Sequence, residues 1–321
     1  MREYKQPAFR ISTPSRKMLS LDASNAKFTV DGNFSGNMSE TLSAFNILLS
    51  ITSSLGNALI LAVLYKETSL HPPTKLLFRC LAITDLCMGV FSQPLAAALH
   101  LSNVTTGMNS EAIYYMVEIN TVSSFVLCGV SVPTSSAISV DRVLALLSGL
   151  RYRYVVTLPR VCAVIVCFWL MGLSCGLIYL WNIRIFFIIS FALVMMCLVI
   201  SVFSYAKVYV KLRQYHLEVR AFPGGQPNGI QVPLNIARYK KSVSSVLWVQ
   251  LALVMCYGPF FAVVILMTYG RMPWGNLQVA FHITATLTYL NSSLNPILYC
   301  WRMRAVRQGA KETIKQLNCC R

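Results

Sequence analysis

The sequence predicts an all-α fold, a bundle of seven transmembrane helices followed by a short amphipathic eighth helix on the cytoplasmic side. The chain of 321 residues is 55% hydrophobic and only 12% charged, which is about half the charged fraction of soluble domains. The apolar residues also fall into long blocks. A helix needs roughly 20 mostly apolar residues to cross a bilayer, where its backbone polar groups must bond within the helix. Seven blocks have this length: Phe45–Tyr65, Cys80–Leu99, Ile119–Val140, Val161–Asn182, Ile185–Ala206, Ser242–Gly270 and Asn276–Trp301.

The charges between these blocks predict how the chain lies in the membrane. Most of the 28 Lys and Arg residues lie at or beyond the helix ends on one side, which places that side in the cytoplasm. We therefore expect a multi-pass plasma-membrane protein with its N-terminus outside and its C-terminus inside. Basic flanks next to anionic lipid also explain the net charge of +17, so nucleic acid is not an expected partner.

Three parts are expected in chain order. Residues 1–43 form a polar, disordered extracellular tail without the apolar core of a signal peptide. Residues 44–300 form the membrane domain, and residues 301–321 form the eighth helix and the cytoplasmic tail. In that last part, basic side chains alternate with apolar ones as in a helix that lies in the lipid headgroup layer.

Two kinds of covalent modification are expected from these parts. Asn33, Asn37 and Asn103 begin Asn-X-Ser/Thr sequons on the predicted outer side, where glycosylation takes place. Cys319 and Cys320 follow the predicted eighth helix next to the membrane and are expected palmitoylation sites.

Asp85 is the one carboxylate in the seven blocks, and a charge at membrane depth usually has a function. Its expected partners lie on other helices and are Asn57, Ser131, Asn291 and Asn295. A carboxylate with neutral oxygens is a ligand set that hard cations accept. We therefore expect Asp85, Ser131, Asn291 and Asn295 to hold Na⁺, and the alternative is a hydrogen bond that only joins helices.

Four blocks contain a proline, which removes a backbone hydrogen bond and bends the helix. The prolines are Pro94, Pro133, Pro259 and Pro296. The bends at Pro259 and Pro296 are expected to serve as hinges.

The third block ends on an acid–base pair, Asp141-Arg142, and each of the other blocks carries its own polar or aromatic signature. These are Gly56-Asn57, Leu81–Asp85, Ser131 with Asp141–Val143, Trp169, Tyr205, Cys256–Pro259 and Asn291 with Asn295–Tyr299. In this order and on seven blocks, the motifs resemble those of the rhodopsin-like (class A) G protein-coupled receptors.

The resemblance implies how several residues act. Asp141 is expected to hold Arg142 in the resting state, and Arg142 to extend toward a G protein and Tyr205 when the sixth helix swings out. Leu150 in the second inner loop is expected to insert into the G protein. The other activation residues implied are Tyr257, Pro259, Asn295, Pro296 and Tyr299.

The chain departs from the family pattern near the predicted ligand pocket. Tyr257 replaces a Trp of the sixth helix, and Val117 replaces the Cys that bonds the second outer loop. That loop is expected to be only Asn182–Arg184. A short loop without a disulfide resembles the melanocortin, lysophospholipid, cannabinoid and adenosine receptors, and melanocortin receptors most. The acidic pocket residues of melanocortin receptors are not found here.

The same positions argue against two ligand classes. Ser124 replaces the Asp of amine receptors, and Tyr289 replaces the Lys to which opsins attach retinal, so covalent retinal is not expected. The expected pocket is apolar with a few polar points, which suits a small apolar or amphipathic ligand. These points are Ser124, Cys128, Tyr257, His282 and Tyr289, and ordinary helix packing is the alternative role of each.

We therefore expect a receptor that binds an unknown extracellular ligand and activates a heterotrimeric G protein, with Na⁺ as the one expected ion. The alternatives are a seven-helix scaffold that no longer signals and, less favoured, a transporter, for which the sequence shows no internal repeat. No catalytic constellation of His, Cys and Asp is found in the loops, so an enzyme is not expected.

Overall fold

The computed structural model of the chain describes residues 36–66, 70–102, 110–148, 151–221, 236–269, 274–302 and 307–309, and every long element in these ranges is a helix. The elements are α2 (Gly36–Lys66), α3 (Pro72–Cys87), the π-helical turn η1 (Met88–Ser92), α4 (Gln93–Ser102), α5 (Ser110–Leu147), α6 (Tyr152–Val155), α7 (Leu158–Trp181), α8 (Ile183–Ala221), α9 (Ile236–Tyr269) and α10 (Trp274–Arg302).

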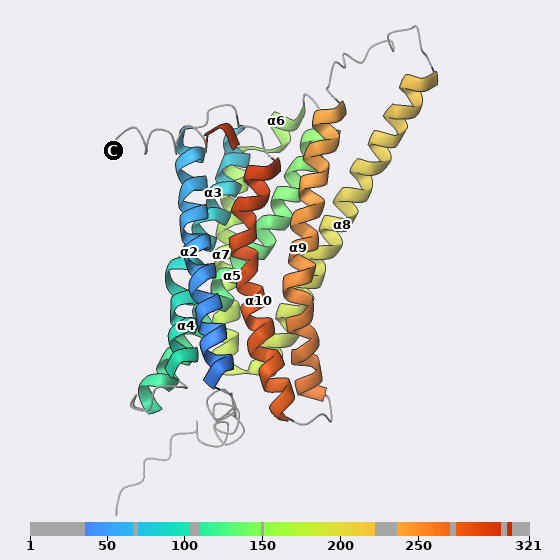
Figure 1. The fold of residues 1–321 in the computed structure, drawn as a ribbon. Coiled ribbons are helices and arrows are strands. Elements are labelled where there is room, and N and C mark those ends of the chain that lie inside the picture. The colour runs from blue at the N-terminus through green and yellow to red at the C-terminus, as the bar shows by residue number, and fades with distance from the viewer. Residues whose placement is uncertain are drawn as a thin grey trace, which may run out of the picture.

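The helices stand side by side as one bundle (Figure 1). Because α3, η1 and α4 follow one another directly, they make a single pass, and the seven passes are α2, α3–η1–α4, α5, α7, α8, α9 and α10. α2 begins at one end of the bundle, whereas α10 finishes toward the other end, where α6 also lies. The predicted seven-helix fold is confirmed. Within the described residues, five passes are long and apolar enough to cross a membrane, and Leu251–Met267 of α9 is a shorter apolar stretch.

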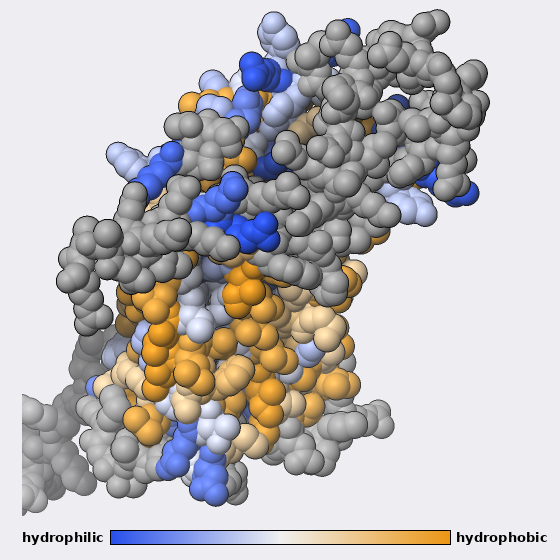
Figure 2. Space-filling model, turned by 45° about the horizontal axis from the view of Figure 1, so that its top comes forward, coloured by the Kyte–Doolittle hydropathy of each residue, from blue (hydrophilic) through white to orange (hydrophobic). Residues whose placement is uncertain are grey.

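The outer surface of the bundle is apolar. Figure 2 shows hydrophobic side chains over the flank of the molecule and hydrophilic ones gathered mainly toward one end. α7 exposes Leu177 and Trp181, and α8 exposes Ile188 and Val199. Exposed apolar side chains along the length of a helix are stable where lipid, not water, surrounds them.

The interior holds polar side chains that join neighbouring helices. Ser43 Oγ on α2 donates to the Ala97 carbonyl on α4 at 3.0 Å, and Ser293 Oγ on α10 donates to the Leu49 carbonyl on α2 at 3.1 Å. Such bonds hold helices together in the membrane, where apolar burial does not drive their association.

Gly56 lets α2 and α10 approach each other closely. A Cβ atom added at Gly56 would lie only 2.9 Å from the Cβ and Cγ atoms of Pro296. The glycine of the first-helix motif therefore fits the proline of the seventh-helix motif, and the two motifs are complementary in shape.

Several helices extend beyond the apolar blocks from which they were predicted. α2 begins at Gly36, so residues 36–43 are helical and the prediction that they belong to a disordered tail was wrong. α8 runs on to Ala221, well past the predicted end of its block at Ala206. Hydropathy reports the apolar thickness that a helix crosses, whereas a helix can continue into water with polar side chains.

The predicted three-residue loop between the fourth and fifth passes is shorter still. Asn182 alone separates α7 from α8, and its Oδ1 accepts hydrogen bonds from the backbone N–H groups of Arg184 at 3.0 Å and Ile185 at 3.2 Å. An Asn in this place satisfies N–H groups that have no partner within the helix. The chain therefore reverses direction over a single residue.

The second pass is interrupted by η1, directly before the predicted bend at Pro94. A π-helical turn accommodates one more residue than an α-helical turn does, because its hydrogen bonds span five residues. Pro133, Pro259 and Pro296 lie inside α5, α9 and α10, which continue through them.

Candidate functional site

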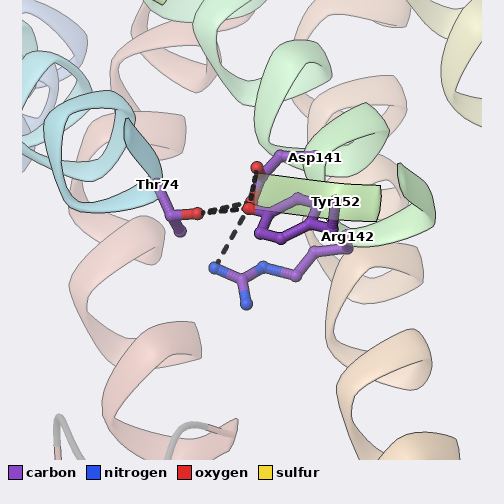
Figure 3. Close-up of polar contacts among 4 residues, drawn as sticks. All are labelled: Thr74, Asp141, Arg142 and Tyr152. Carbon is purple, nitrogen blue, oxygen red and sulfur yellow. Dashed lines mark hydrogen bonds and ion pairs between the residues drawn. The ribbon is translucent and has the colours of Figure 1, made fainter. Parts of the chain in front are cut away.

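Asp141 stands at the end of the bundle near α6 and is held from two sides (Figure 3). The Oγ1 of Thr74, in the first turn of α3, donates to its Oδ2 at 2.9 Å, and the hydroxyl of Tyr152 in α6 donates to its Oδ1 at 2.6 Å. The side chain of Asp141 is almost completely buried. Hydrogen bonds to an ionised carboxylate are among the stronger ones in proteins, so this arrangement fixes the carboxylate in place.

The hydroxyl of Tyr152 stays protonated and therefore remains a hydrogen-bond donor. Burial of its hydroxyl and the hydrogen bond to the Asp141 carboxylate raise the pKa of Tyr152 to about 12. Tyr152 therefore keeps its proton, and the bond to Asp141, at every physiological pH.

Arg142 is only loosely bound to its neighbour. Its Nη2 lies 3.7 Å from Asp141 Oδ2, and this buried nitrogen has no hydrogen-bond partner. The guanidinium instead lies over the ring of Phe78, with Cζ 5.5 Å from the ring centroid. Phe78 in turn meets Tyr299 edge to face, with 5.1 Å between centroids. A guanidinium that rests on an aromatic face keeps its hydrogen-bond donors available for another partner.

Two other predicted coupling residues lie on the seventh and fifth passes. Tyr299 is buried in α10, and Tyr205 lies on α8. Leu150 lies outside the residues that the structure describes, as do Asn33, Asn103, Cys319 and Cys320. Asn37 is exposed in the first turn of α2. Of the predicted eighth helix, residues 307–309 are described and are helical, and Gly309 lies against Val63 of α2.

Asp85 lies fully buried in the middle of the bundle, and two of the predicted partners bond to its carboxylate. Ser131 Oγ donates to its Oδ1 at 3.2 Å, and Asn295 Nδ2 donates to its Oδ2 at 2.7 Å. The buried Oδ1 of Asn291 has no hydrogen-bond partner. A buried acceptor without a partner is available to a cation, and Asp85, Ser131 and Asn291 carry oxygens of the kind that Na⁺ prefers. Asn295 contacts Asp85 through nitrogen and so acts here as a donor.

The prediction that Asn57 contacts the Asp85 carboxylate was wrong. The Nδ2 of Asn57 donates to the Ser53 carbonyl at 2.9 Å and to the Ser292 carbonyl on α10 at 3.1 Å. Ser53 Oγ in turn donates to the backbone carbonyl of Asp85 at 3.0 Å. Asn57 therefore joins the first and seventh passes, and it reaches the second pass only through Ser53.

A cavity of about 200 Å³ opens between the helices on the far side of Asp85 from Arg142. All five predicted pocket residues line it, namely Ser124, Cys128, Tyr257, His282 and Tyr289. The rest of the described lining is mostly apolar, with Phe125, Phe186, Phe187, Phe260 and Phe281 among it, and contains no carboxylate. The chemistry of this lining suits a small ligand that is largely apolar.

The polar points of the cavity bond to one another. Ser124 Oγ lies 3.0 Å from the hydroxyl of Tyr289, Asn120 Nδ2 donates to the same hydroxyl at 3.3 Å, and the hydroxyl of Tyr257 donates to Cys128 Sγ at 3.3 Å. The Oδ1 of Asn120 is buried without a partner. Asn120 thus offers a bound ligand an acceptor on the cavity wall.

Sequence reasoning did not find several of these residues. Asn120 lies one turn before Ser124, so a helical repeat from Ser124 could have indicated it. Thr74, Phe78 and Tyr152 come from other segments than Asp141, and no spacing rule connects them to it.

Comparison with known proteins adds to this geometry. A sequence model of the family described as 7 transmembrane receptor (rhodopsin family) matches residues 56–185 and 175–299. Melanocortin receptor 5 of Homo sapiens is 25% identical over 288 residues, which cover 86% of this chain and 83% of that receptor. Melanocortin receptor 4 of Danio rerio is 26% identical over 300 residues, covering 90% and 88%. Melanocortin receptor 5 of Mus musculus is 24% identical over 287 residues, covering 85% and 83%.

Proposed function

Because this chain belongs to the rhodopsin family of seven-transmembrane receptors, we propose that it binds an extracellular ligand and activates a heterotrimeric G protein. Members of this family are receptors, not enzymes, and this chain is a multi-pass protein of the plasma membrane. In the proposed orientation the end with Gly36 faces outward. The end with α6 and Arg142 faces the cytoplasm, in accordance with the basic residues found there.

The arrangement around Arg142 supports coupling to a G protein most directly. Its neighbour Asp141 is already satisfied by Thr74 and Tyr152, and Arg142 Nη2 has no hydrogen-bond partner. The side chain is 25% exposed and lies at the end of the bundle. A buried donor without a hydrogen-bond partner is costly. An acceptor that reaches Arg142, such as a backbone carbonyl of a docking peptide, therefore makes binding more favourable.

Activation is then a shift between two arrangements of the helices. Ligand in the cavity favours the arrangement in which α9 moves outward at its cytoplasmic end and opens access to Arg142. Pro259 lies at the level of the cavity, between the lining residues Tyr257 and Phe260, and Pro296 lies between the cavity and the cytoplasmic end. At both prolines a missing backbone hydrogen bond lets the helix bend. Na⁺ at Asp85 favours the resting arrangement. The oxygens proposed to bind the ion belong to three passes, α3, α5 and α10, so the ion holds these helices together.

The cavity supports a small apolar or amphipathic ligand. The described lining contains no carboxylate to hold a cationic group, and Tyr289 has no amine to which retinal could be attached. Relatives of this chain are named as melanocortin receptors. At about a quarter identity, those names describe the relatives, and the ligand class proposed for this chain rests on its own cavity lining.

Basal G protein dissociation in cells tests the proposal, normalised to the amount of receptor at the surface. Arg142→Ala removes the donor but leaves a good helix former, so coupling should fall while surface expression survives. Asp141→Asn weakens the hold of Thr74 and Tyr152 on the carboxylate position, so basal coupling should rise. Opposite changes in the two variants would not follow from a common folding defect. Normal coupling of Arg142→Ala, or silence of parent and both variants at normal surface level, would favour a scaffold that does not signal.

A further inference from the structure

Two histidines from different helices meet at the wall of the cavity. His100 lies in the last turns of α4, and His282 lies in the first half of α10. Both line the cavity, and their rings meet edge to face, with 5.3 Å between centroids and 74° between planes. His100 is almost completely buried, so this pair is part of the interior and not of a solvated loop.

This separation is the one that a shared metal ion requires. Zinc binds an imidazole nitrogen at about 2.0–2.1 Å, and the centre of the ring lies about 1.1 Å behind that nitrogen. Two imidazoles on a tetrahedral ion, with about 109° between their bonds, therefore have centroids about 5.2 Å apart. The centroids of His100 and His282 are already at this distance, so their separation fits a shared ion once the rings turn their nitrogens toward a common point.

We propose that His100 and His282 form a two-histidine site for a divalent transition-metal ion of the Zn²⁺ class in the wall of the cavity. Imidazole is a favoured ligand of Zn²⁺, Cu²⁺ and Ni²⁺, whereas Na⁺, Mg²⁺ and Ca²⁺ prefer oxygen, so this site is chemically distinct from the one at Asp85.

The site is open, not closed. Among the residues that the structure describes, no group of three or more His, Cys, Asp or Glu side chains is placed to hold a metal ion. Two histidines therefore leave coordination positions that water, hydroxide or a donor atom of a ligand must fill. The bound ion is expected to exchange readily, and it would place a positive charge in a cavity whose described lining has no carboxylate.

Titration of purified receptor in lipid nanodiscs with Zn²⁺ alone tests the site, with a chromophoric zinc indicator as competitor. The parent should bind Zn²⁺ with both histidines, so His100→Ala and His282→Ala should each weaken the affinity by more than about tenfold. His71→Ala is the matched control, because His71 lies at the start of α3 beside Tyr152 and not at the cavity. Its affinity for Zn²⁺ should equal that of the parent.

A second variant separates loss of the ligand atom from damage to the fold. His282→Cys offers a thiolate, which also binds zinc, and should retain most of the affinity that His282→Ala loses. Equal zinc affinity of the parent and both alanine variants would overturn the proposal. So would absence of zinc binding to the folded parent, since the pair would then be a packing contact only. Because the measurement is metal binding, its failure leaves G protein coupling untouched, and the reverse is also true.

Discussion

The hydroxyl of Tyr152 donates to Asp141 at 2.6 Å, whereas Nη2 of Arg142, the neighbour of Asp141 in the chain, lies 3.7 Å from the same carboxylate. The acid of the Asp-Arg pair is thus held by a side chain of the following inner segment more firmly than by its own arginine. If the resting state depends on this bond, Tyr152 controls basal signalling although it belongs to no motif at the end of the third pass.

Replacing Tyr152 by Phe should raise basal G protein dissociation. The variant removes one hydrogen bond to a carboxylate, a contact worth about 1.5–3 kcal/mol where it is buried. Because Tyr152 is only partly buried and Thr74 still holds Asp141, we expect a severalfold increase, smaller than that of Asp141→Asn. Tyr154→Phe is the control, because Tyr154 is 82% exposed in the same helix. An unchanged basal signal in Tyr152→Phe would show that this bond does not restrain the receptor.

The stability of the receptor should depend on Tyr152 at alkaline pH. The pKa of Tyr152 is raised to about 12, against about 10 for an unfolded tyrosine. A raised pKa contributes stability that is complete below pH 10 and is lost as the pH rises toward 12. The melting temperature of purified parent should therefore exceed that of Tyr152→Phe below pH 10, and the difference should shrink between pH 10 and 12. A constant difference across this range would refute the assignment.

Asp85→Asn should abolish the response of the receptor to Na⁺. In the parent, saturating NaCl should raise the melting temperature, because an ion that binds only the folded state adds stability by mass action. KCl at equal ionic strength serves as the control for screening. The variant keeps the shape of the side chain but lacks the charge to which Ser131 bonds, so NaCl and KCl should act alike on it. A parent that does not distinguish the two salts has no sodium site.

Gly56→Ala should destabilise the bundle. Its new methyl group would lie 2.9 Å from Pro296, and overpacking of this kind costs about 1–3 kcal/mol. Gly258→Ala is the matched control, because a Cβ atom there meets nothing within 4 Å. That change should leave the melting temperature unchanged or higher, since Ala favours a helix over Gly by about 1 kcal/mol. Equal melting temperatures of the two variants would contradict the close fit of α2 and α10.

Much of this architecture is visible in the sequence because a bilayer forces it there. Each apolar block had to become a helix, and the signatures on the blocks placed Asp85, Asp141 and Asn295 on the correct passes. The extents of α2 and α8 were not predictable, because hydropathy ends where lipid ends and not where the helix ends.

The partners of the site residues were less predictable than the residues themselves. Thr74 and Asp141 lie 67 positions apart, and the choice of Thr74 over other hydroxyls nearby is a result of packing. Asn57 is the opposite case, a predicted partner that does not make the predicted contact. It lies on the predicted helix, yet its amide nitrogen donates to the carbonyls of Ser53 and Ser292 and not to the Asp85 carboxylate.

The π-helical turn η1 determines which side chains of the second pass face the cavity. Each residue of an α-helix advances the next side chain by about 100°, so the extra residue in Met88–Ser92 offsets all of α4 by that angle. Deletion of Val90, which is exposed, would convert the turn to regular α-helix and carry His100 and Ala96 away from the cavity wall. An alignment with a receptor whose second helix lacks this insertion therefore needs a one-residue gap here. Without the gap, the pocket positions of α4 are assigned to the wrong side chains.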